Sequence, residues 1–361
     1  MTTGLTSHTR TTTERLGLVK KRGRMTKPAE NVVTANLVEN ATHSETAARP
    51  VILFVLGMHR SGTSALTRVL SLCGGTLPAA LMGAIPGSPG GYWEPRAAIH
   101  LNEAILRRHG SSWFDPTLRL QEEGALDAEE NAARIAEIGA FLTTLPAAPL
   151  VVIKEPRITV LSGLWFQAAR LAGLDIAAVI AVRHPQEVIA SVAAQYRTSP
   201  ELASALWLKY TLLAEKRTRA LPRVFVDYAN LLDDWRREVK RISAALAIDL
   251  NTRDEDAIEG FLTPDLRRQR QCGPVTELFG ADWISQVYET LRAAARDEPW
   301  DGSLLDRVFE AYRASEHDFR TAFEDFRDLS NSLGFRLFRP SVMKPIFEAR
   351  AMAHRRRRTW A

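Results

Sequence analysis

The segment from Val51 to Leu72 constrains the fold of this chain more than any other stretch of its sequence. It begins with six apolar residues, Val51 to Leu56, a run rich in β-branched side chains that is typical of a buried strand in a parallel sheet. A loop bounded by Gly57 and Gly62 follows, after which apolar residues recur at helical spacing (Leu66, Val69, Leu70 and Cys73). A strand, a glycine-bounded loop and a helix predict a phosphate-binding turn, because loop N–H groups and a helix N-terminus both attract an anion.

The loop matches the pattern G-x-x-x-x-G-K-[ST] except at one position, where Thr63 replaces the lysine. In nucleotide hydrolases that lysine binds the β- and γ-phosphates of ATP. Here the positive charge lies inside the loop, on Arg60. We therefore expect the loop to bind a 5′-phosphate without supporting ordinary ATP hydrolysis. A tight turn that binds no ligand is the alternative, because glycines also occur in plain strand–helix connections.

Three further apolar runs predict strands of the same sheet, over residues 150–153, 176–182 and 223–227. The first of them ends in Lys154 and Glu155. Ligands of open α/β sheets bind at the carboxyl ends of the strands, so Lys154 is expected to lie near the loop. The alternative is a surface pair between Lys154 and Glu155 at the end of a strand.

A segment rich in glycine and proline, residues 74–95, is expected to be irregular, and a long loop beside a phosphate site is usually functional. It ends with Tyr92, Trp93 and Glu94. A carboxylate held between aromatic rings can have a raised pKa that suits a general base, which makes Glu94 the candidate for that role. A surface glutamate that caps the following helix is the alternative.

The charge distribution argues against a nucleic-acid partner. The chain has 361 residues and a formal net charge of +5, but residues 1–49 and 344–361 together contribute +9. The remaining 294 residues therefore carry a net charge of −4. No basic residues interleaved with aromatic ones run across this central part, as they do in nucleic-acid grooves.

The two cysteines, Cys73 and Cys272, provide neither a disulfide framework nor a metal-ligand spacing, which favours a reducing compartment such as the cytoplasm. No apolar run approaches the roughly 20 residues of a membrane span, and no secretion signal is expected. The basic segment His354 to Arg358 suits peripheral contact with anionic lipid, although a solvated terminus is the simpler interpretation. The sequence does not constrain the oligomeric state.

Four motifs, in this order along the chain, resemble those of bacterial P-loop-like sulfotransferases that use 3′-phosphoadenosine 5′-phosphosulfate (PAPS). The segment Arg60-Ser61-Gly62-Thr63-Ser64 is similar to the phosphosulfate loop of that family, and Lys154-Glu155-Pro156 is similar to its K-[DE]-P segment. Arg183 and Ser191 match the pattern R-x-x-P-x-x-x-x-S, which binds the nucleotide 3′-phosphate in the family. Such a role suits an arginine fork and a hydroxyl near a helix N-terminus. Tyr228 and Leu231 resemble the family's V-x-Y-x-x-L strand.

The resemblance covers roughly residues 50–270 and implies a role for each matching residue. Donor binding is expected from Arg60, Ser61, Gly62, Thr63, Ser64, Arg183, Ser191 and Tyr228. Catalysis is expected from Arg60, Lys154 and Glu94. Lys154 would replace the charge missing at Thr63, and Glu94 would accept the proton of the acceptor, as the corresponding glutamate does in tyrosylprotein sulfotransferases. PAPS would be the donor and 3′-phosphoadenosine 5′-phosphate (PAP) the product. The acceptor would be a hydroxyl or amine of a carbohydrate, lipid or small metabolite, and no metal is implied.

The predicted fold is α/β, a P-loop NTPase-like three-layer arrangement with a central parallel sheet and additional C-terminal helices. We expect a disordered tail over residues 1–48 and a sulfotransferase-like α/β domain over 49–275. A helical extension over 276–335 would pack on that domain, and 336–361 would form an irregular basic tail. The basic run Arg267 to Arg270 either closes over the nucleotide or forms a solvated charge cluster.

Two other functions fit parts of the sequence. The strand over 223–227 ends in Asp227, which suits a magnesium-binding aspartate of a P-loop small-molecule kinase. A protein that keeps the nucleotide pocket without catalysing a reaction is the other alternative.

Overall fold

The computed structural model describes most of the chain that follows Ala48. That part belongs to one compact unit, Ala48–Ala361. The predicted tail over 1–48 and the basic run Arg267 to Arg270 lie outside the described residues, as does nearly all of 336–361. The described residues are 49–84, 90–252, 254–263, 266, 275, 282–331, 349 and 352.

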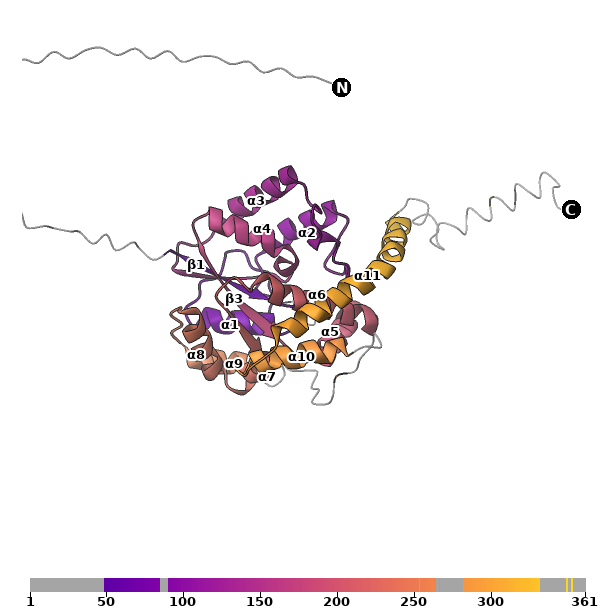
Figure 1. The fold of residues 1–361 in the computed structure, drawn as a ribbon. Coiled ribbons are helices and arrows are strands. Elements are labelled where there is room, and N and C mark those ends of the chain that lie inside the picture. The colour runs from indigo at the N-terminus through magenta and orange to yellow at the C-terminus, as the bar shows by residue number, and fades with distance from the viewer. Residues whose placement is uncertain are drawn as a thin grey trace, which may run out of the picture. The chain divides into compact units, whose positions relative to one another are not determined.

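The described elements alternate between strands and helices in the first half of this unit and are helical in the second half (Figure 1). The strands are β1 (Val51–Leu56), β2 (Leu150–Lys154), β3 (Asp175–Val182) and β4 (Arg223–Asp227). The helices are α1 (Thr63–Leu72), α2 (Arg96–Arg108), α3 (Ala128–Leu142), α4 (Ile158–Leu171), α5 (Pro185–Tyr196), α6 (Pro200–Arg217), α7 (Tyr228–Asp233), α8 (Trp235–Leu246), α9 (Glu255–Phe261), α10 (Trp283–Ala294) and α11 (Gly302–Asn331). A short 3₁₀ helix covers Arg119–Gln121.

The four strands form one parallel sheet in the order β2-β1-β3-β4. Val55 of β1 pairs with Lys154 of β2, and Val182 of β3 pairs with Asp227 of β4, so the carboxyl ends of the strands meet at one edge. β1 is followed along the chain by β2 on one side and then by β3 on the other. The loop after β1 therefore lies at the topological switch point, where ligands of open α/β sheets bind.

Helices cover both faces of the sheet, because the strands are apolar on both sides. Ile52, Phe54 and Leu56 of β1 pack in a core with α2, α3, α4 and α6. Leu53 and Val55 point the opposite way, into a second core with α1, α8 and α9. The predicted α/β three-layer fold with a parallel sheet is confirmed.

The described residues from 283 to 331 form two helices, α10 and α11, joined by a short connection, as their apolar spacing predicted. Tyr288 and Leu291 of α10 belong to the same core as α6 and β3. Tyr312 of α11 is buried, and its hydroxyl donates a hydrogen bond to the carbonyl of Pro116 at 2.6 Å. No described helix has the length and apolar character needed to cross a membrane.

Candidate active site

The loop after β1 has the backbone that its glycines predicted. Gly57 and Gly62 have φ angles of 130° and 86°, in a region that side chains other than glycine rarely enter. A Cβ atom on Gly62 would lie 2.2 Å from the ring of Tyr228, so this position has no room for a larger residue. Arg60 also has a positive φ, 70°, which costs about 1–2 kcal/mol and is typical of functional loops.

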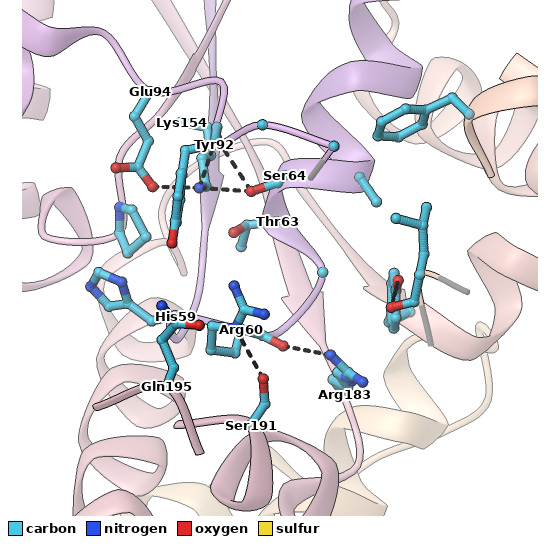
Figure 2. A pocket seen from close by; sticks show the side chains of 18 of the residues that line it. His59, Arg60, Thr63, Ser64, Tyr92, Glu94, Lys154, Arg183, Ser191 and Gln195 are labelled. Carbon is cyan, nitrogen blue, oxygen red and sulfur yellow. Dashed lines mark hydrogen bonds and ion pairs between the residues drawn. The ribbon is translucent and has the colours of Figure 1, made fainter. Parts of the chain in front are cut away.

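A cavity of about 510 Å³ lies at the carboxyl ends of β1, β2 and β3 (Figure 2). Nine of the ten residues predicted to bind the donor or to act in catalysis line it. The exception is Ser61, which is buried and whose N–H donates to the carbonyl of Met58 at 3.2 Å. Tyr228, which was expected on a strand, is the first residue of α7 and closes one side of the cavity. The structure thus brings together residues up to 168 positions apart.

Lys154 ends β2 inside this cavity and is only 2% exposed. Its Nζ lies 2.5 Å from Oε1 of Glu94 and 3.1 Å from both Oγ of Ser64 and the carbonyl oxygen of Tyr92. These three acceptors match the three donors of an ammonium group, which offsets part of the cost of burying the charge. Lys154 therefore does not form the surface pair with Glu155 that the sequence left open.

Glu94 faces the ammonium group of Lys154 (Figure 2). Its carboxylate is 4% exposed and forms a buried ion pair with Lys154. It does not cap the following helix, because the N-cap of α2 is Pro95 and no side chain caps that end. The ion pair joins residues that are 60 positions apart in the sequence. The candidate cation and the candidate base therefore lie at the same end of the cavity.

A second buried network lies behind Lys154. Glu155 is fully buried and bonds to Asn102 of α2 and to Arg157. Asn102 in turn accepts a hydrogen bond from Nε1 of Trp165 in α4 at 2.8 Å. Burial raises the pKa of Glu155 to about 7, while the positive charge of Arg157 opposes the shift. This network fixes α2 against the end of β2, and it thereby holds Glu94 close to Lys154.

Arg183 and Arg60 form the other side of the cavity. Nη1 of Arg183 donates to the carbonyl oxygen of Arg60 at 2.8 Å, and its Nε lies 2.8 Å from the buried carboxylate of Glu187. The guanidinium carbon of Arg183 lies 4.7 Å from the ring centroid of Tyr228, a cation–π distance. Nε of Arg60 donates to Oγ of Ser191 at 3.0 Å. The Nε of Arg60 thus lies beside Ser191, while Arg183 bonds to the backbone of the same residue (Figure 2).

Three further residues that line the cavity are His59, Gln195 and Tyr196. The ring of His59 lies on Trp113 at a centroid distance of 4.4 Å. Burial and three nearby cations hold the pKa of His59 well below its usual range, so the ring is neutral. Burial raises the pKa of Tyr196 to about 12, and the nearby side chain of Tyr92 adds to this shift. The position of His59 beside Arg60 made it a candidate for ligand contact or for local packing, whereas no local pattern in the sequence pointed to Tyr196.

The loop that carries Trp113 is held from beneath by buried polar groups of α6 and α11. Nζ of Lys209 donates to the carbonyl oxygen of Asp115 at 2.8 Å. The hydroxyl of Tyr210 donates to the carbonyl oxygen of Trp113 at 3.3 Å. Tyr312 adds its hydrogen bond to Pro116. Three anchors within four residues fix this loop against the helices.

Lys209 is expected to make the stability depend on pH. Desolvation lowers its pKa to about 8 from 10.5, so the unfolded chain binds more protons than the folded one between these values. The free energy of unfolding should therefore rise as the pH increases from 8 to 10.5. Lys209→Met should reduce this rise, because the burial cost that deprotonation relieves is absent in the variant. Urea unfolding of both proteins across this range tests the prediction, and identical slopes would contradict it.

Comparisons with known proteins give likeness to solved structures alone. No protein-family model and no curated protein matches this sequence. The sulfotransferase domain of the Synechococcus PCC 7002 olefin synthase is 20% identical, with a TM-score of 0.37 over 73% of this chain and 95% of that domain. The sulfotransferase domain of the curacin biosynthetic pathway is 15% identical, with a TM-score of 0.35 over 73% of this chain and 97% of that domain.

A sulfotransferase from Mycobacterium tuberculosis is 17% identical, with a TM-score of 0.29 over 61% of this chain and 72% of that protein. With such low identities and TM-scores, the activity of this chain has to be inferred from its own residues. Those residues define an α/β protein of P-loop-like fold with a polar cavity at the switch point of its sheet.

Proposed function

We propose that this protein is a sulfotransferase that moves a sulfuryl group from PAPS to a hydroxyl or amine of an acceptor. One observation carries the proposal: a single cavity contains two separate groups of anion-binding residues. Lys154 and Ser64 form one group beside the N-terminus of α1, and Arg60, Ser191 and Arg183 form the other. PAPS has its charge at two such places, the 5′-phosphosulfate and the 3′-phosphate.

The donor would lie along the loop with its two charged ends on these two groups. The N–H groups at the start of α1, together with Thr63 and Ser64, suit the 5′-phosphosulfate. Arg183 and Ser191 suit the 3′-phosphate, because a guanidinium and a hydroxyl both donate to its oxygens. The nucleoside between them would pack near Phe261, which lines the same cavity.

Catalysis would depend on positioning and electrostatics. The acceptor oxygen forms a bond to sulfur while the bond between sulfur and the bridging phosphate oxygen breaks. Lys154 stabilises the negative charge that develops on the bridging oxygen, and Glu94 accepts the proton of the acceptor. The ion pair between Lys154 and Glu94 keeps both side chains at the reacting end before the substrates bind.

Arg60 has a different role in this proposal from the one that the resemblance implied. Its Nε hydrogen-bonds to Ser191, so its guanidinium lies at the 3′-phosphate group of residues. The geometry favours Arg60 as a nucleotide-binding residue and leaves Lys154 as the cation nearest the chemistry.

The kinase alternative loses support at Asp227. The carboxylate of Asp227 is buried and accepts a hydrogen bond from the N–H of Ala229 at 2.9 Å, as the N-cap of α7. Asp227 is not among the residues that line the cavity. A magnesium ion bound with a nucleotide there would need this side chain to leave its cap.

Thermal unfolding with nucleotides tests the proposed donor. PAP without magnesium at about 100 times its Kd should stabilise the protein by about 2.7 kcal/mol. ATP with magnesium should do so if the kinase alternative is right. PAP stabilisation without turnover of any acceptor, in the wild type and in Glu94→Gln alike, would favour a non-catalytic nucleotide-binding protein.

Arg183→Ala should weaken PAP binding about 10- to 100-fold and leave adenosine 5′-phosphosulfate binding nearly unchanged. The loss corresponds to the roughly 1.5–3 kcal/mol of hydrogen bonds to a charged group, and the second ligand has no 3′-phosphate to lose. Calorimetry with both ligands measures the difference. Arg170→Ala, which removes an exposed arginine at the end of α4, is the matched control.

Equal losses for both ligands would contradict the assignment of Arg183. The same measurement on Arg60→Ala decides between the two roles of Arg60. A loss confined to PAP supports the 3′-phosphate role, and a loss of turnover with unchanged PAP affinity supports the catalytic one.

A further inference from the structure

The cavity has a second half that the proposed donor does not occupy. Arg183 and Ser191 lie on one side of the loop, whereas Glu94, Tyr92 and His59 lie on the other (Figure 2). The sulfuryl group would lie between these halves, at Lys154. The half that contains Glu94 is therefore where an acceptor must enter.

The wall of this acceptor half is aromatic. Tyr92 and Tyr196 both line it. Behind Tyr196, the rings of Trp113 and Phe114 lie at centroid distances of 4.7 and 5.6 Å, both edge-on. Trp113 also stacks on His59. We call these five residues, Tyr92, Tyr196, Trp113, Phe114 and His59, the aromatic wall.

The aromatic wall is formed in advance of binding. Trp113 and Phe114 belong to the loop that Lys209, Tyr210 and Tyr312 anchor to α6 and α11. A wall held in this way loses little conformational entropy when a flat molecule packs against it. It also cannot spread easily to admit a bulky or branched acceptor.

The acceptor half also has little charge to offer. Its lysine, Lys154, is paired with Glu94 at 2.5 Å, and His59 is neutral. Arg60 donates from its Nε to Ser191, and Arg183 bonds to the backbone carbonyl of Arg60, both on the proposed 3′-phosphate side. An anionic acceptor would enter beside the carboxylate of Glu94 and close to the charges of the donor.

We propose that the acceptor is a small, uncharged aromatic alcohol, that is, a phenol. This inference rests on the proposed function, because it assigns the second substrate of the same site. A phenol ring can pack edge-on or offset against Tyr92 and Tyr196, as aromatic pairs prefer. Its hydroxyl then points toward Glu94 and Lys154, where the donor sulfur would lie.

The chemistry of the base also favours a phenol over a sugar. The pKa of a phenol is near 10, as it is for tyrosine. The pKa of an alcohol is far higher, and bulk water, with a pKa of about 15.7, serves as a guide to it. A carboxylate is a weak base, so it removes a phenolic proton far more readily. In the reaction, the phenol oxygen gains the sulfuryl group, Glu94 gains the phenolic proton, and PAP leaves with the bridging oxygen.

Binding measurements on the full chain saturated with PAP test the inference without requiring turnover. The probes are 2-naphthol, 6-hydroxy-2-naphthoate, which adds one negative charge to the same ring system, and methyl N-acetylglucosaminide, a neutral sugar. We expect calorimetry to show 2-naphthol binding at least about 10-fold more tightly than either of the others. A sugar or a carboxylate that binds as tightly as 2-naphthol would overturn the inference.

Tyr196→Ala and Tyr196→Phe locate the binding site. The alanine variant removes a ring from the aromatic wall and should weaken the binding of 2-naphthol about 10-fold. Its affinity for PAP should change less than 2-fold. The phenylalanine variant keeps the ring and should stay within about 3-fold of the wild type. Unchanged 2-naphthol binding in Tyr196→Ala would overturn the inference. If the alanine variant fails to fold, the comparison of the three probes on the wild type still decides it.

The donor and acceptor assignments fail separately in this experiment. A wild-type protein that does not bind PAP overturns the proposed sulfotransferase. A protein that binds PAP but binds 2-naphthol no better than the sugar keeps the proposed function and loses the phenolic acceptor.

Discussion

Lys154→Ala should lower turnover about 10²- to 10³-fold and weaken PAP binding only modestly, which is the pattern expected for a preorganised charge that acts in the transition state. Charge builds on the bridging oxygen as the sulfuryl group departs, and Lys154 is the cation at that end of the cavity. An interaction made mainly in the transition state affects kcat rather than ground-state affinity. PAP has no sulfuryl group, so its binding reports only the remaining contacts.

Two further variants sharpen this experiment. Lys154→Arg should recover little turnover, because a guanidinium differs from an ammonium in shape and does not fit between Ser64, Tyr92 and Glu94. Lys240→Ala removes an exposed lysine of α8 and is the matched control. Near-normal turnover of Lys154→Ala with saturating donor and acceptor would exclude Lys154 from the chemistry.

Gly62→Ala should abolish measurable PAP binding and destabilise the protein by about 2–5 kcal/mol, from a left-handed backbone and an overpacked site. The φ angle of 86° is unfavourable for alanine. The new Cβ would lie 2.2 Å from the ring of Tyr228, on which the guanidinium of Arg183 stacks. Relieving this clash displaces the loop or the ring, and either movement disturbs both phosphate sites. PAP calorimetry and urea unfolding measure the two effects.

Gly139→Ala is the matched control for this substitution. Gly139 lies inside α3, and a Cβ atom there would meet no heavy atom within 4 Å. The variant should be more stable than the wild type by about 0.5–1 kcal/mol, because alanine favours a helix over glycine. If Gly62→Ala binds PAP as tightly as Gly139→Ala does, the geometry of the loop is not what binds the phosphate.

The parallel sheet and the position of the loop could be predicted because their signals are local. Continuous apolar runs specify strands buried on both faces, and the two glycines mark a turn that only a positive φ can form. The residues at the ends of β1, β2 and β3 were likewise predictable. Parallel strands place their carboxyl ends at one edge, so Arg60, Lys154 and Arg183 had to lie near one another.

The direction of each side chain at that edge could not be predicted. Arg60 was expected at the chemistry, and its Nε donates to Ser191, the residue that we propose for the 3′-phosphate. Glu94 meets Lys154, a contact that the sequence did not predict, and the network of Glu155 and Asn102 holds α2 beside that contact. Backbone dihedrals and contacts between distant elements set these directions. Neither can be predicted from the local periodicity of apolar residues.

The sequence by itself thus determined the class of fold, the glycine-bounded loop and most of the residues that line the cavity around it, since each depends on short-range pattern or on strand order. The tertiary structure alone decided which aromatic residues lie on the other side of the cavity. Tyr92, Trp113 and Tyr196 come from three separate segments and form one wall because α6 and α11 anchor the loop between them. Such a surface depends on packing between distant segments, which the local pattern of apolar and polar residues does not predict.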